Sequence, residues 1–231
     1  MRLILAHRYD VPAHELAARW GTDALLLHPD DLHTERLVLA VDTDGSARAE
    51  FTSRPHVTSV LSRLGGIGPA ELHHVDPQDL AYAAAELDAF LRAWLLAWPG
   101  PVVNRPTVTS LNGPGWRPEQ WAVAAAAVGL AVRTVTRPAP VAAGHVHAAT
   151  PDPGAWPGTD AVQVVVVGNR WFGDVTEAVG RRLCALARAT GCTLLESLVA
   201  ADGTVLHVSA SPDISAPHVA EALVPILDGR P

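Results

Sequence analysis

The chain has 231 residues, 48% of them hydrophobic, and a formal net charge of −7, which fits a compact globular protein and excludes general disorder. No apolar run reaches the ~20 residues of a membrane-spanning helix, and the acidic balance disfavours a nucleic-acid or acidic-membrane surface. Two cysteines make no disulfide framework and no signal peptide is recognisable, so we expect a cytoplasmic protein.

The first hundred residues alternate short apolar runs with helical patterns. A helix from Pro12 to Trp20, stopped by Gly21, lies between two buried runs, which predicts a βαβ unit and a parallel sheet. The turn "TDGS" between two alternating runs predicts a β-hairpin. We expect strands at residues 2–6, 23–29, 57–64 and 101–106, and a long helix at residues 76–98 that is capped by Asp76.

The second half has the pattern of an α+β unit. Strands are expected at residues 131–138, 161–168, 192–200 and 204–210, and helices at residues 118–128, 175–191 and 216–227. Residues 138–160 are rich in Pro, Gly and Ala and are expected to form a surface connection with a short strand around His145. The fold class is therefore α/β with two lobes, residues 1–106 around a parallel sheet and residues 107–231 as an α+β lobe.

The basic residues restrict the chemistry, because all 17 are arginine and the chain contains no lysine. A Schiff base, an ε-amino nucleophile and a lysine that holds a nucleotide phosphate are all excluded. None of the usual short catalytic motifs occurs, and "GGIG" at residues 65–68 opens no helix.

Three stretches carry a family resemblance through their order and spacing. They are "VVNRP" with the following "LNGPGWRPEQWAVAAAAVGLAVRTVTRP", then "VQVVVVGNRWFG", and finally "TGCTLLESLVAADGTVLHVSASPDIS". Together they resemble the ATP-grasp superfamily, especially the branch found in peptide natural-product clusters. The resemblance implies a pre-ATP-grasp-like first lobe and an ATP-grasp-like second lobe, with Mg²⁺ and ATP held between subdomains in the family.

The departures from this family fall at the positions that bind nucleotide and metal. Gly113 stands where the family has a lysine, and His207-Val208-Ser209 replaces the metal-binding Glu-x-Asn. The first metal carboxylate aligns near Ser197, with Glu196 beside it. About two dozen residues separate Thr136 from Val162, where the family has a whole ATP-clasping subdomain. Because Mg²⁺ prefers carboxylate oxygens, we expect a truncated lobe that binds no ATP and needs no cofactor.

Two groups of residues are candidate sites. Arg63, Asn104 and Arg105 lie where family members face the acceptor substrate, and the arginines could hold a carboxylate, although surface salt bridges are the plainer explanation. His7 lies at the end of the first strand, where open α/β sheets bind ligands, although a structural role is the plainer explanation. His145, His147, His207 and Glu196 could hold Zn²⁺ or Fe²⁺ if they converge. The plainer alternative is that His145 and His147 only coat a surface loop.

We therefore expect a non-catalytic protein that binds a peptide or amino acid in natural-product biosynthesis, or a partner of an active ATP-grasp ligase. The alternative is an enzyme that reuses the former ATP cleft for metal-dependent or acid–base chemistry through the histidines. A homodimer formed through Trp94 and Trp98 is possible, although burial against the sheet explains both rings equally well.

Overall fold

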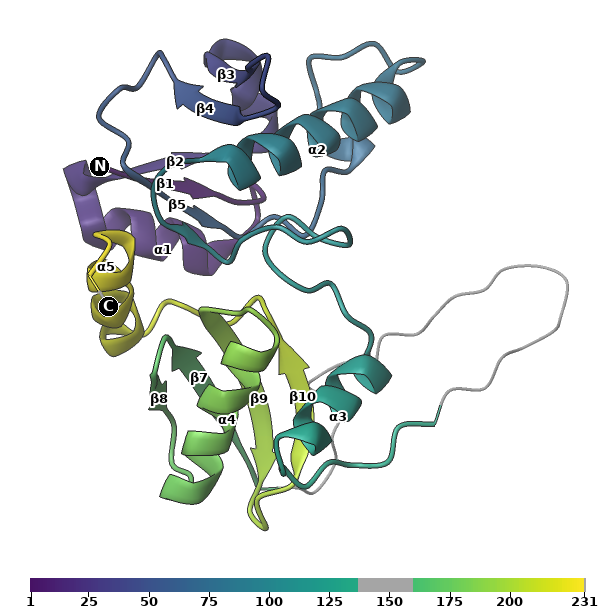
Figure 1. Ribbon diagram of the computed structural model, residues 1–231, viewed down its shortest axis with the longest axis vertical. Coiled ribbons are helices and arrows are strands. Elements are labelled where there is room, and N and C mark those ends of the chain that lie inside the picture. The colour runs from purple at the N-terminus through teal and green to yellow at the C-terminus, as the bar shows by residue number, and fades with distance from the viewer. Residues whose placement is uncertain (137–159, 231) are drawn as a thin grey trace, which may run out of the picture.

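The computed structural model describes residues 1–136 and 160–230, which form two lobes that lie one above the other in Figure 1. The first lobe contains a parallel sheet and a separate hairpin, and the second contains an antiparallel sheet. The predicted α/β fold class is confirmed. Within the described residues, no helix has the length and hydrophobicity needed to cross a membrane.

The first lobe is built on a four-stranded parallel sheet with the order β2-β1-β5-β6. Successive side chains of a strand point to opposite faces of the sheet, so alternate residues are buried in two different hydrophobic cores, one on each face. Leu3, Leu5 and Val60 pack with α2 in one core, whereas Ile4 and Leu61 pack with α1 and α5 in the other. The strands are β1 (Arg2–Leu5), β2 (Ala24–Leu27), β5 (Ser59–Ser62) and β6 (Val102–Val103), and the helices are α1 (Val11–Trp20), α2 (Leu80–Ala97) and α5 (Pro217–Leu227).

Helix α2 begins later than predicted. Asp76 is not its cap, because residues 76–79 form a turn in which the Asp76 carbonyl accepts from the Asp79 N–H and its side chain accepts from Gln78. Asp-Pro sequences favour such turns, so the helix starts at Leu80. Trp94 and Trp98 are 0% and 6% exposed, and both belong to the core of the first lobe. Burial therefore accounts for both rings, and neither provides a dimer surface.

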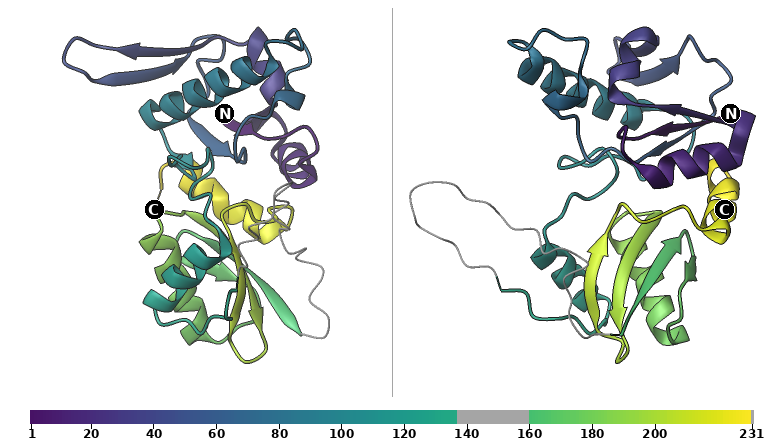
Figure 2. Two further views of the ribbon diagram at one scale, coloured as in Figure 1. Left: turned by 90° about the vertical axis from the view of Figure 1, so that its right-hand side faces the viewer. Right: turned by 180° about the vertical axis from the view of Figure 1, so that it is seen from behind.

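The predicted hairpin is confirmed as β3 (Leu37–Val41) and β4 (Ala47–Phe51), and it projects from the top of the lobe in Figure 2. Its inner side chains Ala49 and Phe51 are buried against α2, whereas most of its outer side chains are exposed. The turn is closed by a hydrogen bond from the Asp42 N–H to the Ser46 carbonyl.

The second lobe has an antiparallel sheet with the order β10-β9-β7-β8. Helices α3 (Pro118–Ala127) and α4 (Glu177–Ala189) cover one of its faces, with Val164, Val166, Leu195 and Val199 in the core between them. Cys184 and Cys192 are free and buried in this core, and burial raises the pKa of both thiols. The strands are β7 (Ala161–Val167), β8 (Arg170–Phe172), β9 (Leu194–Ala200) and β10 (Val205–Ser209).

Two local predictions in the second half are wrong. Residues 131–136 were expected to begin a strand, but they make one isolated bridge, from Val132 to Val205. Arg133 and Thr134 are exposed, so this segment has little apolar surface with which to join a sheet. Residues 170–172, for which no strand was predicted, form β8, because the turn after β7 is completed at Gly168 and Asn169. The strand expected around His145 lies outside the described residues.

Helix α5 lies between the two sheets, beside α1 in Figure 1. Val219, Leu223 and Leu227 are buried in the core that also contains Ile4 of β1 and Val165 of β7. At the end of this helix Asp228 pairs with Arg2 at 2.8 Å and with Arg230. These two arginines lower the pKa of the Asp228 carboxyl, with the hydrogen bond from Arg230 as the largest cause. One apolar core therefore joins the first lobe to the second.

Candidate functional site

Polar side chains converge where the lobes meet, around the loop that follows β10. Residues 210–215, called the seam loop below, connect β10 to α5. The loop receives hydrogen bonds from elements that are far apart in the sequence. Its donors are the side chains of Arg19, Arg63, Asn104 and Asn112. The loop is thus held by both lobes, directly after His207-Val208-Ser209, which the family resemblance aligns with a metal-binding Glu-x-Asn.

Asn104 is the most completely bonded of these residues. It follows β6, is 1% exposed and has a full set of partners. Its side-chain carbonyl accepts from the main-chain N–H groups of Thr193 and Leu194, both at 2.8 Å. Its amide donates to the carbonyls of Leu194 at 2.8 Å and Ala210 at 3.3 Å. Because an asparagine side chain has two donors and two acceptor lone pairs, no capacity is left for a ligand.

Arg63 was expected to hold a substrate carboxylate, and in the structure its partner is a carboxylate of the chain itself. Its Nε and Nη2 donate to the two oxygens of Asp10 at 2.6 and 3.1 Å, and its Nη1 donates to the Pro212 carbonyl at 2.8 Å. The two side chains are only 8% and 10% exposed. Asp10 also accepts from Ala13 and caps α1. This bidentate pair is part of the packing between the lobes.

Gly113, which the family resemblance aligns with a lysine, has a backbone conformation that a lysine does not readily adopt. Gly113 has a φ of 105°, and a Cβ built there would lie 3.1 Å from Cβ of Asn104. Its neighbour Asn112 is 5% exposed, accepts from Ser110 at 2.6 Å and donates to Ser211 of the seam loop. The backbone at Gly113 packs closely against Asn104. Replacing Gly113 by lysine would therefore not be enough to restore a nucleotide-binding site.

The side chains of Arg105 and His7 have partners other than Arg63 and Asp10, although the His7 carbonyl accepts from the Asp10 N–H at 3.0 Å. Arg105 is exposed, and its guanidinium approaches the carbonyls of Leu96 and Gly100 at 3.3 and 3.4 Å, at the end of α2. A cation at a helix C-terminus interacts favourably with the last carbonyls. The imidazole of His7 contacts Glu71, and its side chain is 41% exposed.

The expected metal ligands are described only in part. Glu196 lies opposite Ser209, and His207 opposite Leu198, so Glu196, His207 and Ser209 share one face of the sheet. Ser197 points to the opposite face and is 0% exposed, so Glu196 is the residue at this level of β9 that faces away from α3 and α4. The Glu196 carboxylate accepts from Gln163 and from the Asp213 N–H, both at 3.0 Å. His145 and His147 lie outside the described residues.

These three residues fit Mg²⁺ poorly. Mg²⁺ is a hard cation that prefers carboxylate oxygens in octahedral geometry, whereas this face offers one carboxylate, one imidazole and one hydroxyl. One Glu196 oxygen already receives two hydrogen bonds. The donor set is better suited to a softer ion.

Two groups of polar residues were not identified from the sequence. One is the role of Asp10 and Asn112 in holding the lobes together, which only the fold reveals. The other is a group of three residues at the edge of the parallel sheet, Asp30, His33 and His74. The sequence "LHPDDLH" after the second strand is a weak signal for it.

Comparison with solved structures places this architecture among known proteins. The chain resembles the macrocyclase MdnC bound to its precursor peptide MdnA, from Microcystis aeruginosa MRC, with a TM-score of 0.66, 12% identity and 99% of each chain covered. It resembles the ATP-grasp ligase PsnB in complex with a minimal precursor, with a TM-score of 0.65, 16% identity and 97% and 98% of the two chains covered.

A third similar structure is a RiPP-associated ATP-grasp ligase from Chryseobacterium gregarium in complex with ADP and a leader and core peptide. Its TM-score is 0.62 at 9% identity, with 100% of this chain and 97% of that chain covered. Comparisons with protein-family models and with curated proteins found no match. The chain therefore has an ATP-grasp-like fold, which confirms the resemblance noted in the sequence.

Proposed function

We propose that this protein binds a peptide in natural-product biosynthesis and does not use ATP. The positions that the family resemblance assigns to nucleotide and metal support this proposal: Gly113 stands in place of the lysine with a φ of 105°, and one oxygen of Glu196 already accepts from Gln163 and from the Asp213 N–H. Arg63 and Asn104, two of the four candidate ligand-binding residues, are bonded to groups of the chain itself, so we place the peptide elsewhere on the protein. A triphosphate would meet no lysine and a single carboxylate on the expected metal-binding face.

The peptide role is supported by the similar structures, three of which contain a precursor or a leader and core peptide. In this chain an open groove of about 670 Å³ lies between β4, residues 52–58 and the end of α2. Its apolar lining includes Phe51, Pro55, Val57, Trp98 and Pro99. Peptide-binding grooves combine such apolar contacts with a few polar groups that fix orientation.

Trp98 lines this groove, and Arg105 lies beside it, because its guanidinium approaches the carbonyl of the lining residue Gly100. The indole N–H of Trp98 is buried and finds no acceptor among the described residues, and it lies next to Gly100. Such a donor gains a hydrogen bond if an occupant presents a carbonyl. Arg105, which approaches the Gly100 carbonyl, is exposed and can pair with an acidic side chain of the peptide.

The absence of nucleotide use is tested by titration calorimetry with ATP and Mg²⁺. We expect no saturable heat at millimolar ATP. A Mg²⁺-dependent dissociation constant in the micromolar range would overturn this part of the proposal.

Peptide binding is tested by fluorescence anisotropy with a labelled synthetic precursor peptide, MdnA, which is the peptide present in one of the similar structures. We expect saturable binding that weakens about tenfold in Trp98→Phe, which keeps an aromatic ring but removes the indole N–H, and in Arg105→Gln. Arg181→Gln, on the exposed face of α4, serves as the matched control and should bind like the wild type. Equal affinity in the wild type and all three variants would show that the peptide does not bind in this groove.

A second candidate function is an enzyme that uses metal-dependent or acid–base chemistry. The observation that favours it is the shared face of Glu196 and His207 on neighbouring strands. If it is correct, His207→Ala and Glu196→Gln each lower the amount of Zn²⁺ or Fe²⁺ retained after desalting. Identical retention by the wild type and both variants would exclude a metal at this face.

A further inference from the structure

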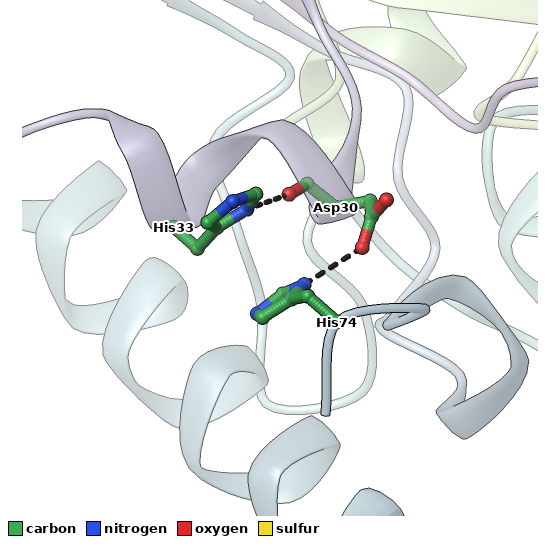
Figure 3. A group of neighbouring side chains, drawn as sticks. All are labelled: Asp30, His33 and His74. Carbon is green, nitrogen blue, oxygen red and sulfur yellow. Dashed lines mark hydrogen bonds and ion pairs between the residues drawn. The ribbon is translucent and has the colours of Figure 1, made fainter. Parts of the chain in front are cut away.

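A second cluster of polar side chains lies away from the seam, beyond the carboxyl end of β2. A short 3₁₀ helix, Pro29–Thr34, begins two residues after this strand and carries Asp30 and His33. His74 comes from the loop after a second 3₁₀ turn, Pro69–Glu71. Figure 3 shows the two imidazoles on the same side of Asp30, although His74 is 44 residues away from it. The carboxyl edge of a parallel sheet is a frequent place for ligands.

Asp30 orients both imidazole rings. The Nδ1 of His33 contacts the Asp30 main-chain carbonyl, and the Nδ1 of His74 lies 2.7 Å from Asp30 Oδ1. A carbonyl and an ionised carboxylate are acceptors only, so each Nδ1 must carry the proton. In the neutral rings the lone pair is then on Nε2. This arrangement, with the other ring N–H donated to a carbonyl or carboxylate, is typical of histidines that bind metal.

The local structure holds the two rings together. Residues three apart on a 3₁₀ helix are eclipsed, which brings His33 over the same side of the helix as Asp30. The loop of His74 is fixed by the His73 N–H, which donates to Asp30 Oδ1 at 2.9 Å, and by Leu72, which is 2% exposed. The imidazole rings are stacked with centroids 4.2 Å apart at an angle of 24°.

We propose that His33 and His74, oriented by Asp30, form a binding site for a divalent transition-metal ion such as Zn²⁺ or Cu²⁺. One ligand atom from each of the three residues, a ring nitrogen or a carboxylate oxygen, lies within 4.8 Å of the others. Two nitrogen ligands of one tetrahedral Zn²⁺ stand about 3.3 Å apart, so the two Nε2 atoms have to turn toward a common point when an ion binds. Both rings are solvent-accessible, which permits a small rotation. Imidazole nitrogen favours Zn²⁺ and Cu²⁺ over Mg²⁺.

The charges around the cluster are mixed. The Asp30 carboxylate attracts a cation, and Arg8 opposes it with Nη2 at 3.5 Å from Asp30 Oδ2. The Arg8 side chain is 50% exposed, so it can move into solvent when an ion binds. Asp31, the next residue, is used elsewhere, since its carboxylate accepts from the His28 N–H at 3.0 Å.

The test is a competition titration with Zn²⁺ alone against a chromophoric chelator. We expect the wild type to bind with micromolar affinity, and His33→Ala and His74→Ala to bind at least tenfold more weakly. Asp30→Asn keeps the main-chain carbonyl but not the carboxylate, and should weaken binding about tenfold, as for other groups that orient metal ligands. His73→Ala keeps the main-chain N–H that bonds Asp30 and is the matched control, expected within twofold of the wild type.

A second measurement on the wild type reports the ligands directly. Cu²⁺ added to the wild type should give an electron paramagnetic resonance spectrum with hyperfine coupling to two imidazole nitrogens, and folded His33→Ala should show coupling to one. Absence of saturable Zn²⁺ binding, or wild-type affinity in folded His33→Ala and His74→Ala, would overturn the assignment. Because no peptide or ATP is present, failure here leaves the proposed peptide role unaffected.

Discussion

The seam between the lobes and the histidine cluster at the edge of the first sheet are both rich in polar groups, but those groups are used differently. Around the seam loop, Asn104 is 1% exposed, and the side chains of Arg63 and Asp10 are 8% and 10% exposed. Each of the three is bonded to groups of the chain itself. In the cluster, His33 and His74 are exposed, and each ring keeps a nitrogen beyond the one bonded to Asp30.

The difference separates two roles for polar residues. Where polar side chains are buried, every donor needs an acceptor, so a satisfied network fixes the arrangement of the lobes. Where they are exposed and only partly used, a ligand can bind without breaking internal bonds. Five predictions test this contrast, ordered from the largest expected effect to the smallest.

Asn104→Ala should cause the largest loss of stability. The change leaves the N–H groups of Thr193 and Leu194 and two carbonyls buried without their partner. At about 1–3 kcal/mol for a buried unsatisfied group, with partial relaxation, we expect a loss of about 3–4 kcal/mol in urea unfolding. Asn169→Ala, an exposed asparagine bonded to Arg188, is the control and should lose less than about 1 kcal/mol. Equal losses would contradict a structural seam.

Arg63→Met should destabilise the protein by about 3 kcal/mol, because it leaves Asp10 nearly buried and unpaired. Asp10→Asn combined with Arg63→Met should recover part of this loss, since it removes the buried charge. Unfolding curves of the single and double variants measure the coupling. A small effect on stability together with lost peptide binding would show instead that Arg63 is a ligand-binding residue.

Gly113→Lys places a lysine where ATP-grasp proteins have one, but should give no affinity for ATP. We expect a loss of about 1–2 kcal/mol, because the φ of 105° and the contact with Asn104 disfavour any side chain. Gly113→Ala should show most of the same loss, which would assign it to the backbone. Micromolar ATP binding by Gly113→Lys would mean that the lysine alone was missing.

Asp228→Asn should change the pH dependence of stability. The arginines at positions 2 and 230 lower the pKa of the folded Asp228 carboxyl below its value in the unfolded chain. Its contribution is therefore fully present above the unfolded pKa of about 3.9 and is lost as the pH falls through the lower folded pKa. Urea midpoints of the variant and the wild type should differ at pH 7 and converge near pH 2. The exposed Asp23→Asn should show no such pattern.

His33→Ala and His74→Ala should have the smallest effect on the metal-free protein, below about 0.5 kcal/mol each, since surface substitutions rarely exceed this. Thermal unfolding in the presence of a chelator checks this value. With Zn²⁺ added, only proteins with both histidines should gain in melting temperature. A large loss without metal would mean that the cluster is a structural element like the seam.

Most elements of the fold could be predicted from the sequence, because they depend on local patterns. Gly21 ends α1, the "TDGS" turn joins β3 to β4, and the alternating apolar residues of β9 face the helices. The start of α2 was predicted three to four residues too early because Asp76-Pro77 suits both a cap and a turn.

The candidate site was less predictable, since its contacts join distant residues. Arg63 and Asn104 were selected for their position, but the identity of their partners depends on how the seam loop returns from β10. The register of β9 and β10 decides that Glu196, and not Ser197, shares a face with His207. Asp30 and His74 could be related only through the folded first lobe.

Helix α5 has a consequence for how the protein is made. The face of β1 and β5 that carries Ile4 and Leu61 is covered in part by α5. Residues 217–227 of this helix leave the ribosome about 150 residues after β5. Until then Ile4 and Leu61 lack several of their native neighbours, so the nascent first lobe exposes an apolar surface. Synthesis of the second lobe takes place while that surface is open, which makes this interval the stage at which chaperone binding or misassembly is most expected.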